Sequence, residues 1–301
     1  MRLVWKNAEL IEEKDANLSI YDSACMWGDM VFEMTRTFNR QTFKLNEHMD
    51  RLRRSCEYLE IPIPYQWSYL RGVYDDMIEV NEKDWRDDDE VRGLINVSRG
   101  ILPMYAEAGM GDAGTQIIIA NFPLRHILKD KSWVYVWGVD LVTPTQRAIP
   151  EYLLDAKIKS RSRQHYKMAE LEVLRVNPKA WALLLDPDGF VAESTGSNFF
   201  MVKNGVVYTP EGRNCLRGIS RDFIIELCYM QVIDVKETNI TLYDVYNCDE
   251  AFLTNTPYSI VPVRSVNNHP IKLGAVTKKL TESWINSVDC DFVKQARVWD
   301  G

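Results

Sequence analysis

The chain has 301 residues, of which 46% are hydrophobic and 26% are charged, and its formal net charge is −7. This balance is typical of a globular protein, and the length favours two domains. An acidic chain is a poor candidate for binding nucleic acid. No apolar stretch approaches the roughly 20 residues that a membrane-spanning helix needs, and the N-terminal residues lack the apolar core of a signal peptide.

The six cysteines are scattered along the chain without a C-x-x-C pair, which predicts free and mostly buried thiols. Only four histidines occur, which leaves little room for a metal site. We therefore expect a cytoplasmic protein with no metal and with neither a membrane nor a nucleic acid as partner.

The first 121 residues alternate between strand and helix patterns. Two β-rich runs around a polar turn predict a hairpin over 31–45, and Asn46 is expected to cap the helix that follows. The pattern then predicts a helix over 66–79 and strands over 93–99 and 115–121.

Residues 122–131 hold a proline and mixed charges without a clear period, which indicates a linker. Further along the chain we expect the following elements: a strand over 133–142, a helix over 163–176, a tight turn over 186–189, a hairpin of strands 199–203 and 206–209 around Asn204 and Gly205, and helices over 221–230 and 277–285. These patterns predict an α/β (α+β) fold with domains over 1–121 and 132–301, joined by the linker.

Several common catalytic motifs are absent from the sequence. It contains no G-x-G-x-x-G, Walker A, H-E-x-x-H or G-x-S-x-G pattern. Dinucleotide-binding, P-loop, zinc-protease and α/β-hydrolase functions therefore lose support.

Five local segments, taken together, resemble one family. They are residues 47–52 (Glu-His-Met-Asp-Arg-Leu), Lys159, residues 189–200, residues 216–221 (Leu-Arg-Gly-Ile-Ser-Arg) and residues 252–256 (Phe-Leu-Thr-Asn-Thr). Their order and spacing are similar to those of the class IV aminotransferases, the fold-type IV pyridoxal-phosphate enzymes. The resemblance implies two mixed α/β domains, of which the larger C-terminal one is a pseudo-barrel, and a homodimer that uses pyridoxal 5'-phosphate.

The resemblance also implies a role for individual residues. Lys159 stands at the family's spacing from Glu193 and would form a Schiff base with the cofactor aldehyde, then move a proton as a free amine. Glu193 would keep the pyridine nitrogen protonated by its charge. Leu216 would pack against the ring.

The cofactor phosphate needs a cation and several N–H donors. By the resemblance, Arg51 would supply the cation. The backbone amides of Ile219 and Ser220 would face the phosphate from a helix N-terminus, where Ser220 could also serve as the cap. Asn255 and Thr256 would complete this binding site.

The substrate pocket departs from the family pattern, because Met34 stands where branched-chain enzymes have a glycine and the carboxylate traps of its relatives are missing. Trp27, Phe32 and Asn96 align with pocket positions. We expect one further arginine to bind the substrate carboxylate through charge-assisted hydrogen bonds. The candidates are Arg36, Arg99, Arg125 and Arg163.

Three functions remain open from the sequence. The first is a transaminase that moves an amino group from an amino acid to a 2-oxo acid in a ping-pong cycle. The second is a lyase of the aminodeoxychorismate type, which needs no amino acceptor. The third is a non-catalytic protein on the same scaffold, which the presence of Lys159, Glu193 and Arg51 opposes.

Overall fold

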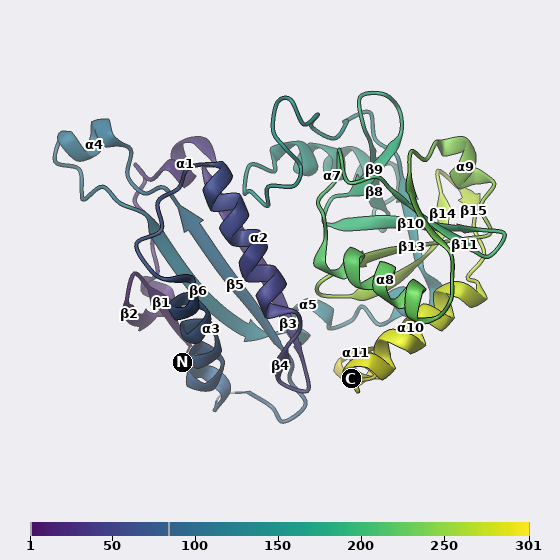
Figure 1. The fold of residues 1–301 in the computed structure, drawn as a ribbon, viewed down its shortest axis with the longest axis horizontal. Helices are drawn as coiled ribbons and strands as arrows, with labels where there is room; N and C mark the ends of the chain where they lie inside the picture. Colours follow the sequence, from purple (N-terminus) through teal and green to yellow (C-terminus); the bar gives the residue numbers. More distant parts are fainter. Residues whose placement is uncertain (1, 84, 301) are drawn as a thin grey trace. The chain divides into compact units, whose positions relative to one another are not determined.

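The structure is a computed structural model that describes residues 2–83 and 85–300. Its contacts divide the chain into two compact units (Figure 1). The first contains Met1–His126 and Ile158–Ser162, and the second contains Ile127–Lys157 and Arg163–Gly301. The division after residue 126 falls inside the predicted linker, but the sequence pattern does not predict that Ile158–Ser162 belongs with the first unit. The domain boundaries at 1–121, 122–131 and 132–301 stay a prediction.

A six-stranded antiparallel sheet forms the first unit, in the order β2-β1-β6-β5-β3-β4. Its strands are β1 (Leu3–Lys6), β2 (Glu9–Glu12), β3 (Met30–Phe38), β4 (Gln41–Thr42), β5 (Val91–Ser98) and β6 (Gln116–Pro123). Helix α2 (Leu45–Tyr58) packs on β3, and α3 (Trp67–Glu82) packs on β1 and β6 (Figure 1). The shorter helices are η1 (Glu13–Asp15), α1 (Ser23–Trp27), α4 (Pro103–Glu107) and α5 (Arg125–Leu128), which ends beyond residue 126.

The second unit is built on a closed ring of six strands, β10-β13-β14-β7-β8-β9, in which β9 pairs back with β10. These strands are β7 (Val139–Val142), β8 (Trp181–Leu185), β9 (Val191–Ser194), β10 (Ser197–Lys203), β13 (Glu250–Asn255) and β14 (Ser259–Val266). Strands β11 (Val206–Pro210), β12 (Val235–Thr238) and β15 (His269–Pro270) extend the ring. This closed sheet confirms the pseudo-barrel expected for the C-terminal domain.

Helices cover the barrel from several sides. They are α6 (Trp133–Trp137), α7 (Gln164–Val176), α8 (Ile219–Met230), α9 (Leu242–Tyr246), α10 (Ala275–Val288) and α11 (Phe292–Trp299). Of these, α7 packs on β8, while α8 and α10 pack on β13 and on each other (Figure 1). No helix within residues 2–83 and 85–300 is long and apolar enough to cross a bilayer.

Both predicted turns between strands are confirmed. Gly189 has φ +90° and donates its amide to the carbonyl of Asp186, which closes the β8–β9 hairpin. Asn204 and Gly205 have φ values of +51° and +77°, as a type I′ turn requires, and they join β10 to β11. The hairpin over 31–45 and the later helices are confirmed as well, with shifted ends.

Three local predictions are wrong. Residues 133–137 form α6 rather than a strand. Gly138, at φ +69°, ends this helix before β7 begins. Asn46 is not the N-cap residue of α2. Lys44 occupies that position in the left-handed conformation, and its side chain makes no capping hydrogen bond. Ser220 is not a cap either, since α8 begins at Ile219 after Gly218.

Residues 122–131 are not an irregular linker throughout, because they include the end of β6 and helix α5. The first two residues continue the ladder with β5, where Phe122 pairs with Arg92 and Pro123 with Val91. Pairing with a neighbouring strand therefore overrides the weak local pattern.

Glu250 is a buried carboxylate that caps α10 from the neighbouring strand. It accepts hydrogen bonds from the amides of Val276 (3.0 Å) and Thr277 (2.7 Å) and from the Thr277 hydroxyl (2.7 Å). We expect Glu250→Ala to lower the free energy of unfolding by about 1–3 kcal/mol, because buried donors lose their acceptor. Urea denaturation would measure this loss. Glu282→Ala, on the exposed side of α10, should change stability by no more than about 0.5 kcal/mol.

Candidate active site

Lys159 lies on a short extended segment that pairs with β3 inside the first unit. The Phe32 amide donates to the Lys159 carbonyl (2.9 Å), and the Arg161 amide donates to the Met30 carbonyl (2.8 Å), with Val31 opposite Ser160 between them. Main-chain pairing therefore fixes the position of the lysine backbone. It explains why Ile158–Ser162 belongs to this unit.

The side chains of this segment gather around the ring of Phe32, which is buried. The Lys159 Nζ lies 4.8 Å from the ring centroid, and the Arg161 Cζ lies 3.6 Å from it. Asn96 of β5 is the register partner of Phe32, and its Oδ1 accepts from the Arg161 Nε (3.2 Å) and from a terminal nitrogen of the same guanidinium (2.7 Å). Two cations and an amide thus share one face of the sheet.

Arg51 is held by a buried carboxylate. Its Nε and one terminal nitrogen donate to Glu33 at 2.6 Å and 2.8 Å, and the His48 Nδ1 lies 2.7 Å from the same carboxylate. Burial alone would raise the pKa of Glu33, but the Arg51 guanidinium and His48 outweigh it and hold that pKa far below its ordinary value. Burial lowers the pKa of His48, against the pull of Glu33. We therefore assign an ionised Glu33 and a neutral His48 that donates from Nδ1.

Glu193 lies on β9 in the second unit and is buried. Its carboxylate accepts from the Leu216 amide (3.1 Å), from the Asn198 side-chain amide (3.3 Å) and from the Tyr166 hydroxyl. Burial and the neighbouring Glu193 raise the pKa of Tyr166 well above its ordinary value, so Tyr166 stays a neutral donor. The three donors fix the orientation of the carboxylate.

Leu216 lies close to the N-terminus of α8, where the first amides lack a side-chain cap. Gly218 is the N-cap residue, and a Cβ built on it would lie 2.1 Å from the Asn198 Oδ1, so any larger residue would displace the Asn198 side chain. Ile219 and Ser220 are the first two helical residues, and both are buried. An N-terminus of this kind favours an anion through its amides and its dipole.

The turn after β13 adds polar groups to the second unit. The Asn255 side chain donates to the Ser197 hydroxyl (2.7 Å) and accepts from the Tyr258 amide (2.8 Å), so it bridges β10 and the turn that contains Thr256. Ser197 directly precedes Asn198, which contacts Glu193. Glu193, Leu216, the start of α8 and Asn255 are therefore linked through two adjacent residues of β10.

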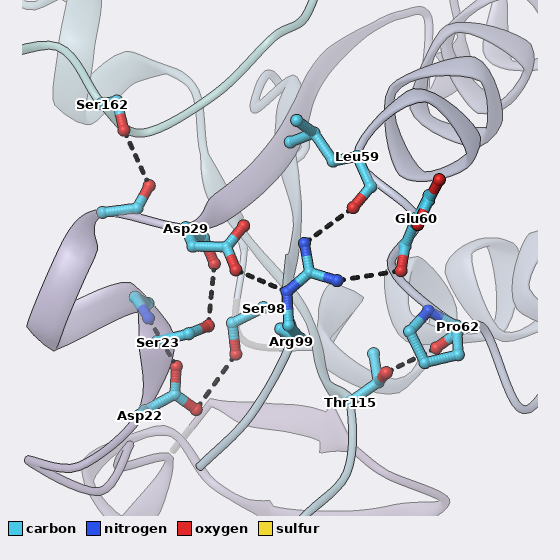
Figure 2. A network of polar contacts seen from close by, with 12 residues as sticks. Asp22, Ser23, Asp29, Leu59, Glu60, Pro62, Ser98, Arg99, Thr115 and Ser162 are labelled. Atoms are coloured by element: carbon cyan, nitrogen blue, oxygen red, sulfur yellow. Dashed lines mark hydrogen bonds and ion pairs between the residues drawn. The ribbon is translucent and has the colours of Figure 1, made fainter. Parts of the chain in front are cut away.

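Three of the four candidate arginines have identified partners in the first unit. The Arg99 guanidinium donates to Asp29 (2.7 Å) and to the carbonyls of Leu59 and Glu60, as Figure 2 shows. Arg125 forms an ion pair with the buried Asp89 (2.5 Å). Arg36 is 1% exposed, and its Cζ lies 3.9 Å from the centroid of Phe38.

The remaining predicted substrate residues lie apart from one another. Arg163 is the N-cap residue of α7 in the second unit, and its Cζ lies 4.7 Å from the ring centroid of Tyr166. Trp27 ends α1 in the first unit and is 71% exposed. Next to it, the carbonyl of Gly28 accepts from the Ser162 hydroxyl (3.0 Å; Figure 2), which ties α1 to the segment of Lys159.

Tyr166, Asn198 and Arg161 were missed by the sequence prediction. Asn198 belongs to the Glu-x-x-x-x-Asn stretch from which Glu193 was predicted, so the motif held the signal. Tyr166 and Arg161 follow Lys159 closely but belong to different units. Spacing along the chain alone could not place their side chains.

Residues 30–266 match the family described as amino-transferase class IV, and the chain therefore belongs to the class IV aminotransferases. A putative branched-chain-amino-acid aminotransferase of Methanocaldococcus jannaschii is 32% identical, over 93% of this chain and 94% of its own length. A D-alanine aminotransferase of Bacillus licheniformis is 28% identical, over 96% of this chain and 98% of its own length.

Solved structures of the family superpose on the whole fold. The crystal structure of the branched-chain amino acid aminotransferase of Escherichia coli gives a TM-score of 0.83 at 26% identity, over 95% of this chain and 94% of that chain. The PLP form of the Thermobaculum terrenum enzyme gives 0.80 at 25% identity, over 99% and 97%. The chain is an aminotransferase, and its cofactor is pyridoxal 5'-phosphate.

The described residues fit this cofactor. The first amides of α8, which no side chain caps, suit a phosphate. A carboxylate already oriented by three donors suits a protonated pyridine nitrogen. A lysine amine beside an aromatic face suits an aldehyde.

Proposed function

We propose that the chain transfers an amino group between an α-amino acid and a 2-oxo acid in a ping-pong cycle, with Lys159 as the residue that carries the cofactor. The observation that supports this most directly is the pairing of the Lys159 segment with β3, which fixes the lysine backbone and places its amine beside Phe32. The bound cofactor supplies an electron sink for the charge that develops at the substrate Cα.

Lys159 and Glu193 divide the proton chemistry. With the cofactor bound, the Lys159 amine would act as the base that moves the proton of the substrate Cα. Glu193 holds a proton on the pyridine nitrogen through its negative charge. Tyr166, Asn198 and the Leu216 amide keep that carboxylate oriented. The Leu216 side chain would pack against the ring of the bound cofactor.

Two kinds of group hold the phosphate in our proposal. Arg51 supplies a guanidinium whose orientation is fixed by Glu33. The amides of Ile219 and Ser220 donate from the start of α8, and the turn of Asn255 and Thr256 adds further polar groups. A charged donor and a helix dipole both favour the dianion.

The substrate is an α-amino acid with an apolar side chain in our proposal. The names of several relatives support this, because they include branched-chain-amino-acid and D-alanine aminotransferases. Phe32 and Trp27 supply apolar surface in the first unit, and Asn96 supplies a polar contact.

We also propose that the protein is a cytoplasmic homodimer with two domains divided within residues 122–131. The outer side of α7 supports association, since Met168, Leu171, Leu174 and Val176 are between 40% and 65% exposed. All six cysteines are free thiols, as expected for a reducing compartment. Light scattering of the holoenzyme would test the dimer.

The test of the proposed function is a panel of amino donors against pyruvate and 2-oxoglutarate. The panel contains L-leucine, L-valine, L-glutamate, D-alanine and an R-amine. We expect turnover with apolar amino acids that depends strictly on a 2-oxo acid, together with absorbance changes of the cofactor when either substrate is added alone. Turnover that continues without an acceptor would point instead to a lyase.

Glu193→Gln is expected to lower kcat/KM by about 10²–10³-fold, because a neutral amide cannot stabilise the protonated pyridine nitrogen. Steady-state kinetics on the best donor would measure it, and the absorbance spectrum would confirm that the cofactor is still bound. Glu172→Gln is the matched control, since Glu172 of α7 bonds to Thr145. Equal kinetics for both variants would contradict the role of Glu193.

A further inference from the structure

The substrate's α-carboxylate needs a cation close to Lys159. An α-amino acid carries its amine and its carboxylate on the same carbon, so a group that recognises the carboxylate must face the same space as the lysine amine. Among the arginines predicted for this role, Arg99 is held by Asp29 and two carbonyls, and Arg125 is paired with Asp89. Arg36 is buried against Phe38.

Arg161 meets the requirement. It lies two residues after Lys159 on the segment that pairs with β3, so both side chains point to the same face of that strand. The contacts with Phe32 show this directly, because the Lys159 Nζ and the Arg161 Cζ lie 4.8 Å and 3.6 Å from the same ring centroid.

The Arg161 guanidinium is also held in a fixed orientation. It stacks on Phe32, and its Nε and one terminal nitrogen donate to a single oxygen of Asn96. These two bonds and the contact with the ring orient the guanidinium. A guanidinium placed in advance loses little rotamer freedom when it binds a carboxylate.

The segment that carries Arg161 is anchored at both ends. The Lys159 carbonyl accepts from Phe32, and the Ser162 hydroxyl donates to the Gly28 carbonyl (Figure 2). The backbone between them is therefore fixed relative to β3 and α1. This rigidity gives the guanidinium a defined distance from the lysine amine.

We propose that Arg161 binds the α-carboxylate of the amino-acid substrate, with Asn96 and Phe32 as its positioning residues. This inference rests on the proposed function. It adds a specificity-determining residue that was not among the arginines predicted from the sequence. The site accordingly selects α-amino acids over amines of the same side chain, because only the former carry the anion that Arg161 recognises.

The experiment measures binding as well as turnover in the holoenzyme. The binding probes are 4-methylpentanoate, which carries the carboxylate without an amine, and its neutral amide 4-methylpentanamide. The variants are Arg161→Gln, Arg161→Lys and Asn96→Ala. Arg53→Gln is the control, because Arg53 is an exposed arginine of α2 that pairs with Glu57.

We expect Arg161→Gln to raise the Kd of 4-methylpentanoate by about 10- to 100-fold and to leave the Kd of the amide within about twofold. For Arg161→Lys, the Kd of 4-methylpentanoate should lie between those of the wild type and Arg161→Gln. An ammonium keeps the positive charge but cannot make the two parallel hydrogen bonds of a guanidinium. Asn96→Ala should weaken binding of the carboxylate by about 3- to 10-fold. The control should match the wild type with both probes.

In turnover, kcat/KM for L-leucine should fall in Arg161→Gln by a similar factor, mainly through KM, while that for 3-methylbutylamine stays unchanged. Equal losses with the carboxylate and the amide would mean a structural role and would overturn the proposal. An effect on L-glutamate but not on L-norvaline would overturn it too, since Arg161 would then read a side-chain carboxylate. A wild type that neither binds the cofactor nor transaminates would instead refute the proposed function.

Discussion

Lys159→Ala should lower the rate of transamination by at least about 10⁴-fold, because the variant loses both the amine that binds the cofactor and the base that moves the Cα proton. The measurement is single-turnover kinetics with the best donor from the panel. The same variant should still bind the cofactor through its phosphate and pyridine contacts, but without a covalent bond. Mass spectrometry after borohydride reduction should find no adduct on the variant and one on the wild type.

Lys157 and Lys167 are the matched controls, because they flank Lys159 in the sequence. Lys157 pairs with Asp155 (3.0 Å), and Lys167 lies 3.5 Å from Glu170 on the surface of α7. Replacing either lysine with alanine should change the rate by less than about threefold, as expected for exposed ion pairs. A reduced adduct on either lysine would show that the wrong lysine was assigned.

The sequence predicts Lys159 as the cofactor lysine through its spacing to Glu193, but it could not show how the lysine is held. The bonds from Phe32 and to Met30 join residues that are more than 120 positions apart in the chain. No local pattern encodes such a pairing. The same limit applies to Arg161, whose partner Asn96 lies on another strand.

Local chemistry determined which elements were predicted well. The turn at Asn204 and Gly205 requires positive φ at two positions, and these residues adopt it readily. By contrast, residues 133–137 alternate bulky apolar side chains that favour a strand, yet they form α6 against β14. Packing of Tyr135, whose hydroxyl donates to the Tyr258 carbonyl (3.1 Å), accompanies the helical turn. Tertiary contacts overrode a weak local preference there.

The second large effect is expected at Glu33, the buried carboxylate of the first unit. Glu33 and His48 are at most 1% exposed, and Arg51 is 6% exposed. Glu33→Gln should lower the free energy of unfolding by about 3–5 kcal/mol near neutral pH, because it removes the charged acceptor of two hydrogen bonds that the buried Arg51 guanidinium donates. Urea denaturation of the apoprotein would measure this loss. Glu47→Gln, at an exposed position on α2, the helix that carries His48 and Arg51, should have an effect below about 0.5 kcal/mol.

The pH dependence gives this prediction a second readout. The pKa of Glu33 lies below its ordinary value of 4.5, so the folded state binds fewer protons than the unfolded state. The stability that Glu33 contributes is therefore complete above pH 4.5 and is lost as the pH falls towards the folded pKa. The wild type and Glu33→Gln should accordingly differ most near pH 7 and become more alike below pH 4.5.

His48 acts in the same direction at a higher pH. Its pKa is lowered from 6.5 by burial, so unfolding below pH 6.5 takes up a proton that the folded protein does not bind. The wild type should thus begin to lose stability below about pH 6.5, before Glu33 contributes. His48→Gln should make this first phase smaller and keep the second, because burial also lowers the pKa values of His126 and His165.

The Glu33 carboxylate also connects stability to the cofactor. If Arg51 binds the phosphate as we propose, Glu33 reduces the positive charge that Arg51 offers to it, so the folded apoprotein gains stability at some cost to phosphate affinity. Pyridoxal 5'-phosphate should therefore raise the melting temperature of Glu33→Gln by more than that of the wild type, since the phosphate replaces the missing counter-charge. An equal rise in both proteins would contradict the assignment of Arg51 to the phosphate, while the loss of stability in the apoprotein would still stand as the effect of removing a buried charged acceptor.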